Sequence, residues 1–343
     1  MNILVTGAAG YVGSTLTPLL ASRGHRVVAV DCDEDRLRRL EASLPSESRV
    51  ELLSYSLDEL ATKPKLFSGI EAVVHLAGIS SDAAAERDSE LTWHINVEAA
   101  VAVGRAAKTA GVRRFLFAST AAIYQVPMGH ELEHAVLQEG HQLLLDPPLG
   151  VYARSKLAAE SALAELADAN FLVILVRKGS LYGYSPVMRW DLVINRLVLD
   201  AWLGRPFLLH DLGAVWRPIA HVHDAAKAYL HLLSISPGEV NGAMFNVAER
   251  NARLVDLCLE IDRTARQTLG RGLILRHGRS PFPQRTGRVS GEGLRRLGWF
   301  PSRSLGAGVS ELLERLGKWE VASQRKPLLR RPAWVCFDAR QNE

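Results

Sequence analysis

The stretch "NILVTGAAGYVG", residues 2–13, decides the fold. A short apolar run typical of a strand is followed by three glycines in a GxxGxxG spacing, and a helical pattern comes next. The first glycine permits a tight turn, the second lets a pyrophosphate approach the backbone, and the third lets the helix pack on the strand. The phosphates then lie at the helix N-terminus. The loop residues expected to contact a dinucleotide are Gly7, Gly10, Tyr11, Val12 and Gly13.

The second apolar run, "RVVAVD" at 26–31, ends in an acid, Asp31, 18 residues after Gly13. An acid at this point accepts hydrogen bonds from the ribose 2′-hydroxyl of NAD and repels the 2′-phosphate of NADP. We therefore predict NAD as the cofactor, with Asp31 and the adjacent Cys32 beside it. The alternative is an ordinary surface aspartate at a strand end. Pro18 is an irregularity, because proline removes a hydrogen bond inside the first helix.

Apolar runs continue to alternate with helical patterns through the first half of the chain. Further runs lie at 49–53, 71–77, 113–119 and 170–177, and helical stretches lie at 88–110 and 150–168. Fully apolar strands that alternate with helices indicate a parallel sheet covered on both faces. The predicted fold class is therefore α/β, a Rossmann-type doubly wound parallel sheet.

After Arg177 the pattern loosens, and glycine and proline punctuate 179–218. Helices are predicted near 224–233, 253–269 and 304–320. We expect a nucleotide-binding domain at 1–178, to which 214–248 returns, and a smaller C-terminal α/β lobe for the substrate. That lobe comprises 179–213 and 249–321, and the remaining residues, 322–343, form an irregular basic tail.

Composition excludes several classes of function. The net charge is +4, but the tail alone carries five Lys or Arg against two acids, so a nucleic-acid partner has little electrostatic support. No apolar run approaches the roughly 18 residues of a membrane span, and no basic leader precedes an apolar stretch at the start. Three separated cysteines, Cys32, Cys258 and Cys336, do not suggest a disulfide framework. We expect a cytoplasmic protein without a membrane partner.

The stretch "YARSK" places Tyr152 and Lys156 four residues apart, on one face of a predicted helix. A tyrosine base must lose a proton near neutral pH although its ordinary pKa is about 10, a gap of about 4 kcal/mol. A lysine about 4 Å away supplies about that much at an effective dielectric near 20. Alone, the pattern is usually surface helix. Here it follows "FASTAAIY" at 117–124, where Ser119 or Thr120 would lie at the ligand-binding edge of the sheet.

At this point the chain resembles the extended short-chain dehydrogenase/reductase family, in its NAD-dependent nucleotide-sugar epimerase and dehydratase branch. The resemblance covers residues 2–320. It rests on the motifs "TGAAGYVG", "HLAG", "FASTAAIY", "PPLGVYARSK", "VRKGSLYG", "WRPIAHVHDAAKA" and "RRLGWFP", in this order.

The resemblance implies a role for individual residues. Tyr152 would be the acid/base, Lys156 would hold the nicotinamide ribose and lower the pKa of that tyrosine, and Thr120 would be the catalytic hydroxyl. Leu76, Ala77 and Gly78 would line the cofactor, and Asn96 would have a structural role. Ser180 would contact the sugar. Arg217 and, more weakly, Arg288 would clamp the diphosphate. For both arginines the alternative is a buried salt bridge. Family dimers also suggest a homodimer through 88–110 and 150–168.

Departures from the family pattern narrow the chemistry. Ala121 and Ala122 stand where the dehydratases carry an acid pair, and methyl groups cannot move protons. A nucleotide-sugar 4-epimerase that passes hydride to NAD and back therefore remains, with a net keto-sugar reductase or dehydrogenase as the alternative. A non-catalytic NAD-binding regulator is a third class. The nucleotide base and the sugar are not decided by the sequence.

The letters "HELEH" at 130–134 spell HExxH, the signature of zinc proteases. That motif needs a helix, so that His130 and His134 share a face with Glu131 beside the metal. The third ligand at the usual spacing is missing, because residue 140 is glycine rather than histidine. We predict no metal site here and expect a loop or short surface helix near the mouth of the active site.

Overall fold

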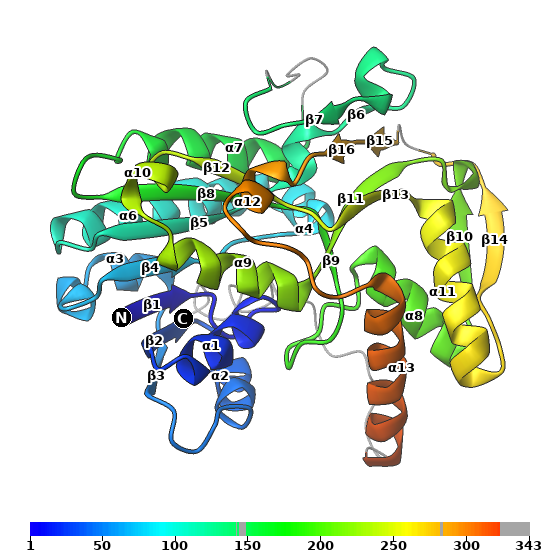
Figure 1. The fold of residues 1–343 in the computed structure, drawn as a ribbon, viewed down its shortest axis with the longest axis horizontal. Coiled ribbons are helices and arrows are strands. Elements are labelled where there is room, and N and C mark those ends of the chain that lie inside the picture. Colours follow the sequence, from blue (N-terminus) through cyan, green and yellow to red (C-terminus); the bar gives the residue numbers. More distant parts are fainter. Residues whose placement is uncertain (142, 144–148, 282–283, 323–343) are drawn as a thin grey trace.

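A computed structural model of the chain describes residues 1–141, 143, 149–281 and 284–322. Within these residues, the main sheet has seven strands, all of them parallel (Figure 1). In spatial order they are β12 (Met244–Val247), β8 (Leu172–Lys178), β5 (Arg114–Thr120), β4 (Ala72–His75), β1 (Asn2–Thr6), β2 (Arg26–Asp31) and β3 (Val50–Ser54). The chain order reverses at β1, and ligands of doubly wound folds bind at the carboxyl edge beside such a switch point. The predicted fold class is confirmed.

Helices cover both faces of this sheet. One face carries α1 (Gly13–Ser22), α2 (Glu34–Glu41) and α9 (Val222–Ser234). The other carries α3 (Leu57–Ala61), η1 (Pro64–Phe67), α6 (Ala100–Thr109) and α7 (Val151–Ala164). Successive side chains of β1 go to opposite cores, Ile3 and Val5 to the first and Leu4 to the second. That alternation explains why the strands are apolar throughout.

The helix predicted over 88–110 is present, from Ser89 to Thr109, but it is not α-helical throughout. The chain forms α4 (Asp82–Arg87), α5 (Ser89–Trp93) and a π-helical segment, η2 (His94–Ala99), before α6 begins. Within η2, the buried Asn96 donates to the Ser155 hydroxyl at 3.0 Å and exchanges two hydrogen bonds with the backbone of Ile79. The wide turn thus coincides with the point where this helix is tied to the loop after β4 and to α7. This agrees with the structural role predicted for Asn96.

The smaller lobe lies beside the carboxyl edge, at the right of Figure 1. Its sheets are β9 (Ser180–Tyr182), β11 (Trp216–His221) and β13 (Arg250–Arg253), and the pair β10 (Pro206–His210) and β14 (Ile274–Gly278). Its long helices are α8 (Val193–Leu203), α11 (Leu254–Leu269) and α13 (Leu305–Ala322). The short segment η5 (Asp211–Gly213) lies against β10 and β14, whereas α10 (Pro237–Val240) and α12 (Glu292–Arg296) lie against β8 and β12 of the main sheet. A separate apolar core, including Leu197, Leu257 and Val309, holds this lobe together.

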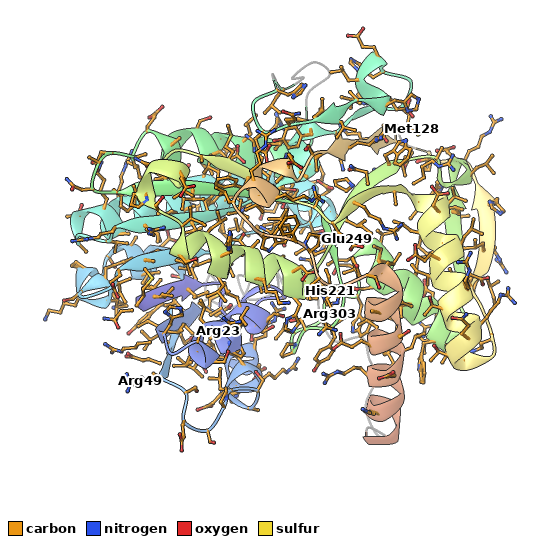
Figure 2. The ribbon with its side chains drawn as sticks, in the orientation of Figure 1. Arg23, Arg49, Met128, His221, Glu249 and Arg303 are labelled. Atoms are coloured by element: carbon orange, nitrogen blue, oxygen red, sulfur yellow. The ribbon has the colours of Figure 1, made fainter. Side chains whose placement is uncertain are left out.

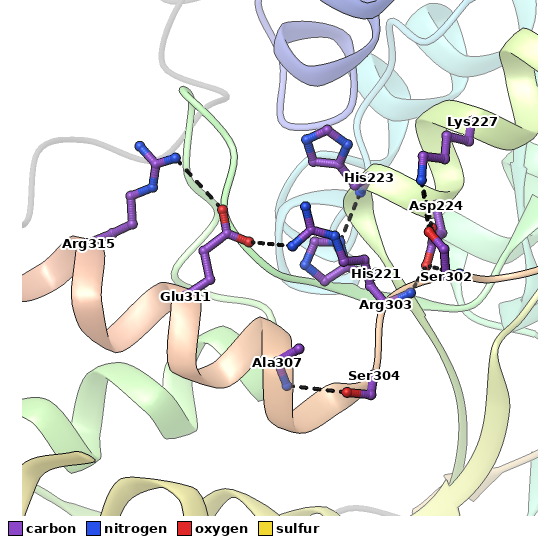
Figure 3. A network of polar contacts seen from close by, with 10 residues as sticks. All are labelled: His221, His223, Asp224, Lys227, Ser302, Arg303, Ser304, Ala307, Glu311 and Arg315. Carbon is purple, nitrogen blue, oxygen red and sulfur yellow. Dashed lines mark hydrogen bonds and ion pairs between the residues drawn. The ribbon is translucent and has the colours of Figure 1, made fainter.

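A polar network joins α13 to α9 (Figure 3). The buried Asp224 accepts hydrogen bonds from the backbone N–H groups of Ser302 and Arg303, at 3.0 and 2.9 Å. Arg303 in turn pairs with Glu311 on α13 at 3.5 Å. Figure 2 shows Arg303 beside His221, where α9 approaches α13. The lobe is therefore fastened to the helix layer of the main sheet.

Two short two-stranded pairs lie at the top of Figure 1. They join β6 (Val126–Pro127) to β15 (Arg285–Thr286) and β7 (Val136–Leu137) to β16 (Arg288–Val289), the first antiparallel and the second parallel. Along the chain, the 3-10 segment η3 (Ala121–Tyr124) precedes β6, and a second one, η4 (Glu131–His134), lies between β6 and β7. Segments about 150 residues apart in the sequence thereby become neighbours.

Of the predicted tail, only Ala322 is described, as the last residue of α13, and the rest lies outside the described residues. The same holds for the "DPP" at 146–148. Among the helices of the described ranges, none has both the length and the apolar composition that a bilayer span requires.

Candidate active site

The glycine loop connects β1 to α1 and lies against the loop that follows β4. Gly7 has φ +66°, and a Cβ there would lie 2.6 Å from the backbone nitrogen of Ala77. A Cβ on Gly13 would overlap the carbonyl oxygen of Gly7. The turn and the close helix packing therefore require glycine at these two positions. Gly10 is under less internal constraint, with its N–H donating to the Gly7 carbonyl at 3.0 Å.

The two side chains between these glycines have different surroundings. The Tyr11 hydroxyl donates to the Gly183 carbonyl at 2.6 Å and accepts from Asn195 at 3.1 Å. Its buried ring therefore ties the loop to the segment after β9. Val12 is the residue before α1, and the α1 residue Leu16 donates to its carbonyl. Because the Tyr11 hydroxyl already has these two partners, a bound dinucleotide would meet the backbone of Tyr11 rather than its side chain.

Asp31 ends β2 beside the glycine loop. Its carboxylate accepts from the backbone N–H of Ala9 at 3.0 Å and of Asp33 at 3.2 Å. Burial raises the pKa of Asp31, while these two hydrogen bonds lower it. The adjacent Cys32 is exposed. The structure thus places the predicted acid next to the predicted pyrophosphate loop.

The residues after β4 meet helix α7. Leu76 and Ala77 follow β4, where the backbone N–H of Leu76 donates to the Thr6 carbonyl at 3.0 Å. Gly78 has φ +148°, and a Cβ there would lie 3.0 Å from Lys156 Nζ and 2.7 Å from Asn96 Oδ1. The loop after β4 is therefore closely packed against α7, with the lysine directly beneath it.

Thr120, Tyr152 and Lys156 come together at the carboxyl edge. Thr120 ends β5, and its hydroxyl accepts from the backbone N–H of Ala122 at 3.1 Å, which caps η3. Tyr152 and Lys156 lie one turn apart on α7. The Lys156 ammonium lies 4.7 Å from the centroid of the Phe117 ring. A hydroxyl, a phenol and an amine thus share one site, as the sequence predicts.

Burial controls the ionisation of this site. It raises the pKa of Tyr152, and hydrogen bonding from Thr120 only partly offsets that rise. It also lowers the pKa of Lys156 to about 8, against the opposing charge of Glu160. Arg189 is the cation that lowers this pKa, and desolvation of the phenolate outweighs its effect. The assistance that Lys156 is predicted to give Tyr152 stays a prediction.

A second buried amine, that of Lys178, lies beneath the same edge and was not predicted. Its Nζ donates to the Ser119 carbonyl at 3.0 Å and to the Tyr229 hydroxyl at 3.2 Å. Burial and the charge of Lys156 hold its pKa well below the ordinary value. The Ser119 hydroxyl is buried and has no hydrogen-bond partner in the described part of the chain. Lys178 could have been singled out from the sequence, because it is a charged residue at the end of an otherwise apolar strand.

The two arginines predicted to clamp a diphosphate have different surroundings. Arg217 Nη1 donates to the carbonyls of Trp216 and Arg285, at 3.0 and 2.6 Å. Arg217 and Arg285 both interact electrostatically with Asp82, and burial lowers the pKa of each guanidinium. Arg288 instead donates to the His134 carbonyl at 2.9 Å and lies over the Trp216 ring at 4.6 Å. Arg285, three residues earlier in "QRTGR", is the arginine that sequence reasoning missed.

Two further segments border the cleft. Ser180 begins β9 and is half-buried, with Ile219 as its register partner on β11. Arg189 was not predicted: its Nη1 donates to the Ser80 hydroxyl at 2.8 Å, and its Nε and Nη2 form a fork on Asp191 at 2.7 and 2.6 Å. The charge of Arg189 lowers the pKa of Tyr152, which places it near the catalytic residue.

The HExxH letters form no metal site. Glu131–His134 is a four-residue 3-10 segment, so the two histidines do not share an α-helical face. His130 Nδ1 accepts from the Leu132 backbone at 3.1 Å, which caps the segment. In the described ranges, no three His, Cys, Asp or Glu side chains are grouped so that they could hold a metal ion. A short surface segment, as predicted, is what the structure contains.

Comparison with known proteins gives a consistent result. The profile of the family described as "NAD dependent epimerase/dehydratase family" matches residues 3–248. A UDP-glucose 4-epimerase of Rhizobium leguminosarum bv. trifolii is 25% identical over 342 residues, covering 94% of this chain and 98% of that protein. One of Streptomyces lividans is 28% identical over 335 residues, covering 91% and 94%.

Solved structures are similar over nearly the same length. MoeE5 in complex with UDP-glucuronic acid and NAD, and MoeE5 in complex with UDP-glucose and NAD, each have a TM-score of 0.78 and 25% identity. Each comparison covers 93% of this chain and 100% of the other. A UDP-glucose-4-epimerase from Stenotrophomonas maltophila, with bound NAD and formylated UDP-arabinopyranose, has a TM-score of 0.80 at 21% identity, which shows the shared fold.

Proposed function

The chain belongs to the NAD dependent epimerase/dehydratase family, and from this premise we propose that it is a 4-epimerase of nucleotide sugars. The observation that carries the proposal is the meeting of Thr120, Tyr152 and Lys156 at the carboxyl edge, next to the glycine loop. The UDP-glucose 4-epimerases among its relatives, which it matches over almost their whole length, support the substrate class.

The residues on the cofactor side fit NAD. The close approaches at Gly7 and Gly13 shape a backbone cradle at the start of α1, and the carboxylate of Asp31 lies at its edge. Asp31, Gly78 and Lys156 would hold the two riboses and the nicotinamide end. Bound NAD supplies a ring carbon that accepts hydride from the sugar and returns it.

The chain's own side chains supply the proton chemistry and the orientation. Tyr152 would accept the proton of the sugar 4-hydroxyl and later return it, and Thr120 would hold the same oxygen by hydrogen bonding. A charged Lys156 would stabilise the phenolate form of Tyr152, which burial opposes. Arg217 and Arg285 would bind the diphosphate, because forked guanidinium groups match phosphate oxygens.

The experiment measures how much epimer and how much NADH the protein forms from the same substrate. Purified protein is incubated with UDP-, dTDP- and GDP-sugars, with and without added NAD, while the epimers are separated and absorbance at 340 nm is followed. Formation of the 4-epimer without net NADH supports the proposal. NADH formed in proportion to product would overturn it in favour of a net dehydrogenase, which uses the same three residues.

The homodimer predicted from the resemblance is also part of the proposal. On the outer side of α5 and α7, the exposed Trp93 borders a recess of about 350 Å³, with Glu90, Val151 and Arg154 around it. An exposed tryptophan beside a catalytic helix is typical of a surface that a second copy covers. Light scattering of the wild type and of Trp93→Asp tests this: a monomer for the wild type contradicts it. Cytoplasmic residence stays a prediction from the cysteine content.

A further inference from the structure

Helix α4 fixes a carboxylate beside the catalytic tyrosine. Ser81 caps the helix, its hydroxyl accepting from the Ala84 backbone at 3.4 Å, and Asp82 is the first helical residue. Ala84 and Ala85 belong to a small apolar cluster against which Tyr152 packs. The position of Asp82 relative to Tyr152 is therefore set by packing rather than by a free loop.

The Asp82 side chain lies near the start of α7, because a Cβ on Gly150 would come 3.9 Å from its Oδ1. It is exposed to solvent, so a ligand can reach its carboxylate. It interacts electrostatically with Tyr152 and with Arg217 and Arg285. These two arginines are themselves joined, by the hydrogen bond from Arg217 to the Arg285 carbonyl. A sugar whose 4-hydroxyl meets Tyr152 and whose diphosphate meets the arginines would therefore lie near this carboxylate.

A second carboxylate adds to the negative charge. Glu86 lies one turn after Asp82, and its Oε1 accepts from the backbone N–H of Val151 at 3.1 Å. It raises the pKa of Asp82, as does the partial burial of that residue in the cleft. Neighbouring protein atoms therefore do not fully compensate the charge of Asp82 toward the sugar.

The cations near Tyr152 do not cancel this charge. Arg189 is already held in a fork by Asp191, so that pair carries no net charge. Lys156 is buried under Gly78, and its charge is not among those that shift the pKa of Asp82. Arg217 and Arg285 would be matched by the two charges of a diphosphate. The sugar subsite is thus left negative.

We propose that Asp82 is a specificity-determining residue, which admits neutral or ammonium-bearing sugars and rejects sugars that carry a carboxylate. This proposal rests on the proposed function, and it specifies which nucleotide sugars the enzyme accepts. Two like charges in a cleft repel each other more strongly than in water, because the effective dielectric is lower. A hydroxyl or an ammonium, in contrast, donates hydrogen bonds to the carboxylate.

The test compares UDP-glucose with UDP-glucuronate. We expect the wild type to prefer UDP-glucose in kcat/KM by about tenfold or more, and Asp82→Asn to shrink that ratio by about tenfold. Glu90→Gln, which removes an exposed carboxylate from α5, is the matched control and leaves the ratio unchanged. Raising the salt from 50 to 500 mM should shrink the ratio for the wild type but not for Asp82→Asn, which a purely structural role would not produce.

The outcomes separate this inference from the function on which it rests. Turnover of UDP-glucose with a ratio that Asp82→Asn leaves unchanged, or a wild type that prefers UDP-glucuronate, overturns the role of Asp82 alone. Binding of both sugars by calorimetry gives the same ratio where turnover is too slow to measure. Binding of neither overturns the proposed function and this inference together.

Discussion

The two sides of the cleft are built in different ways. The cofactor side consists of the first residues after consecutive strands, which are Gly7 after β1, Asp31 at the end of β2 and Gly78 after β4. The substrate side brings together Asp82, Arg217 and Arg285 from three separate parts of the chain. The first side follows from the order of strands in a parallel sheet, whereas the second depends on which loops pair across the lobe.

The comparison also extends to charge. On the cofactor side, backbone groups and close approaches dominate, and the lysines beneath it are held at lowered pKa values by burial. On the proposed substrate side, formal charges of both signs interact, since Arg217 and Arg285 lower the pKa of Asp82 while Glu86 raises it. A substitution on the first side should therefore change catalysis or stability, and one on the second should change affinity and specificity.

The largest expected effect is at the point where the two sides meet. Tyr152→Phe removes the only phenol that contacts Thr120 among the described residues, and we expect kcat to fall by about 10² to 10⁴. Tyr184→Phe, at a tyrosine whose ring lies against Arg315 of α13 in the smaller lobe, is the control and should keep full kcat. Steady-state kinetics with UDP-galactose and UDP-glucose measure both. A Tyr152→Phe enzyme with normal kcat would remove Tyr152 from the chemistry.

The next test sharpens the view that the cofactor side depends on backbone approach. Gly7→Ala forces a side chain into a positive-φ turn against the Ala77 backbone, and we expect it to cost about 3 kcal/mol of unfolding free energy. Gly24 also has positive φ, at +78°, but open space around it, so Gly24→Ala should cost only about 1 kcal/mol. Urea denaturation compares them. Equal costs would show that contact with the loop after β4 is unimportant.

The substrate side is tested by its arginines. Arg217→Gln and Arg285→Gln should each raise KM by about 10-fold to 100-fold with little change in kcat, because a charged phosphate contact is lost. Arg288→Gln should change KM by about twofold or less, since Arg288 binds the His134 carbonyl. A larger increase in KM for Arg288→Gln than for Arg285→Gln would instead support Arg288, the residue predicted from the sequence, as the second arginine that binds the diphosphate.

A pH profile tests the buried lysine. Burial lowers the pKa of Lys156 to about 8, so its charge is present below that pH and is lost as the pH rises through it. If the charged form assists Tyr152, kcat/KM should fall on the alkaline side with a midpoint near pH 8. Lys156→Arg keeps its charge at all these pH values, so its lower activity should lack this limb. The same limb in both enzymes would assign it to another group.

The smallest effect is expected at the HExxH letters. His134 is exposed and offers its backbone carbonyl to Arg288, so His134→Ala should leave kcat within about twofold of the wild type. Metal analysis of purified protein should find no stoichiometric zinc. One zinc per chain, lost in His134→Ala, would contradict both the conformation of η4 and the assignment of the substrate side.

Much of the cofactor side could be predicted because local patterns determine it. The glycine spacing, the acid at the end of the second strand and the four-residue interval between Tyr152 and Lys156 are all readable without a structure. The predicted strands coincide with the observed ones within a few residues. The π-helical segment within the helix over 88–110 could not be predicted, because it coincides with contacts of Asn96 to segments far away in the sequence.

Sequence alone thus determined the fold class and the family, and it predicts the cofactor loop and the proposed catalytic residues, since each depends on spacing within one strand-helix unit. Only the tertiary structure shows that Arg217 is hydrogen-bonded to the Arg285 carbonyl, and that Asp82 interacts electrostatically with both arginines and with Tyr152. It also decided that burial raises the pKa of Tyr152. These outcomes depend on the pairing of strands about 150 residues apart and on desolvation by the folded chain. Neither can be predicted from a local sequence pattern.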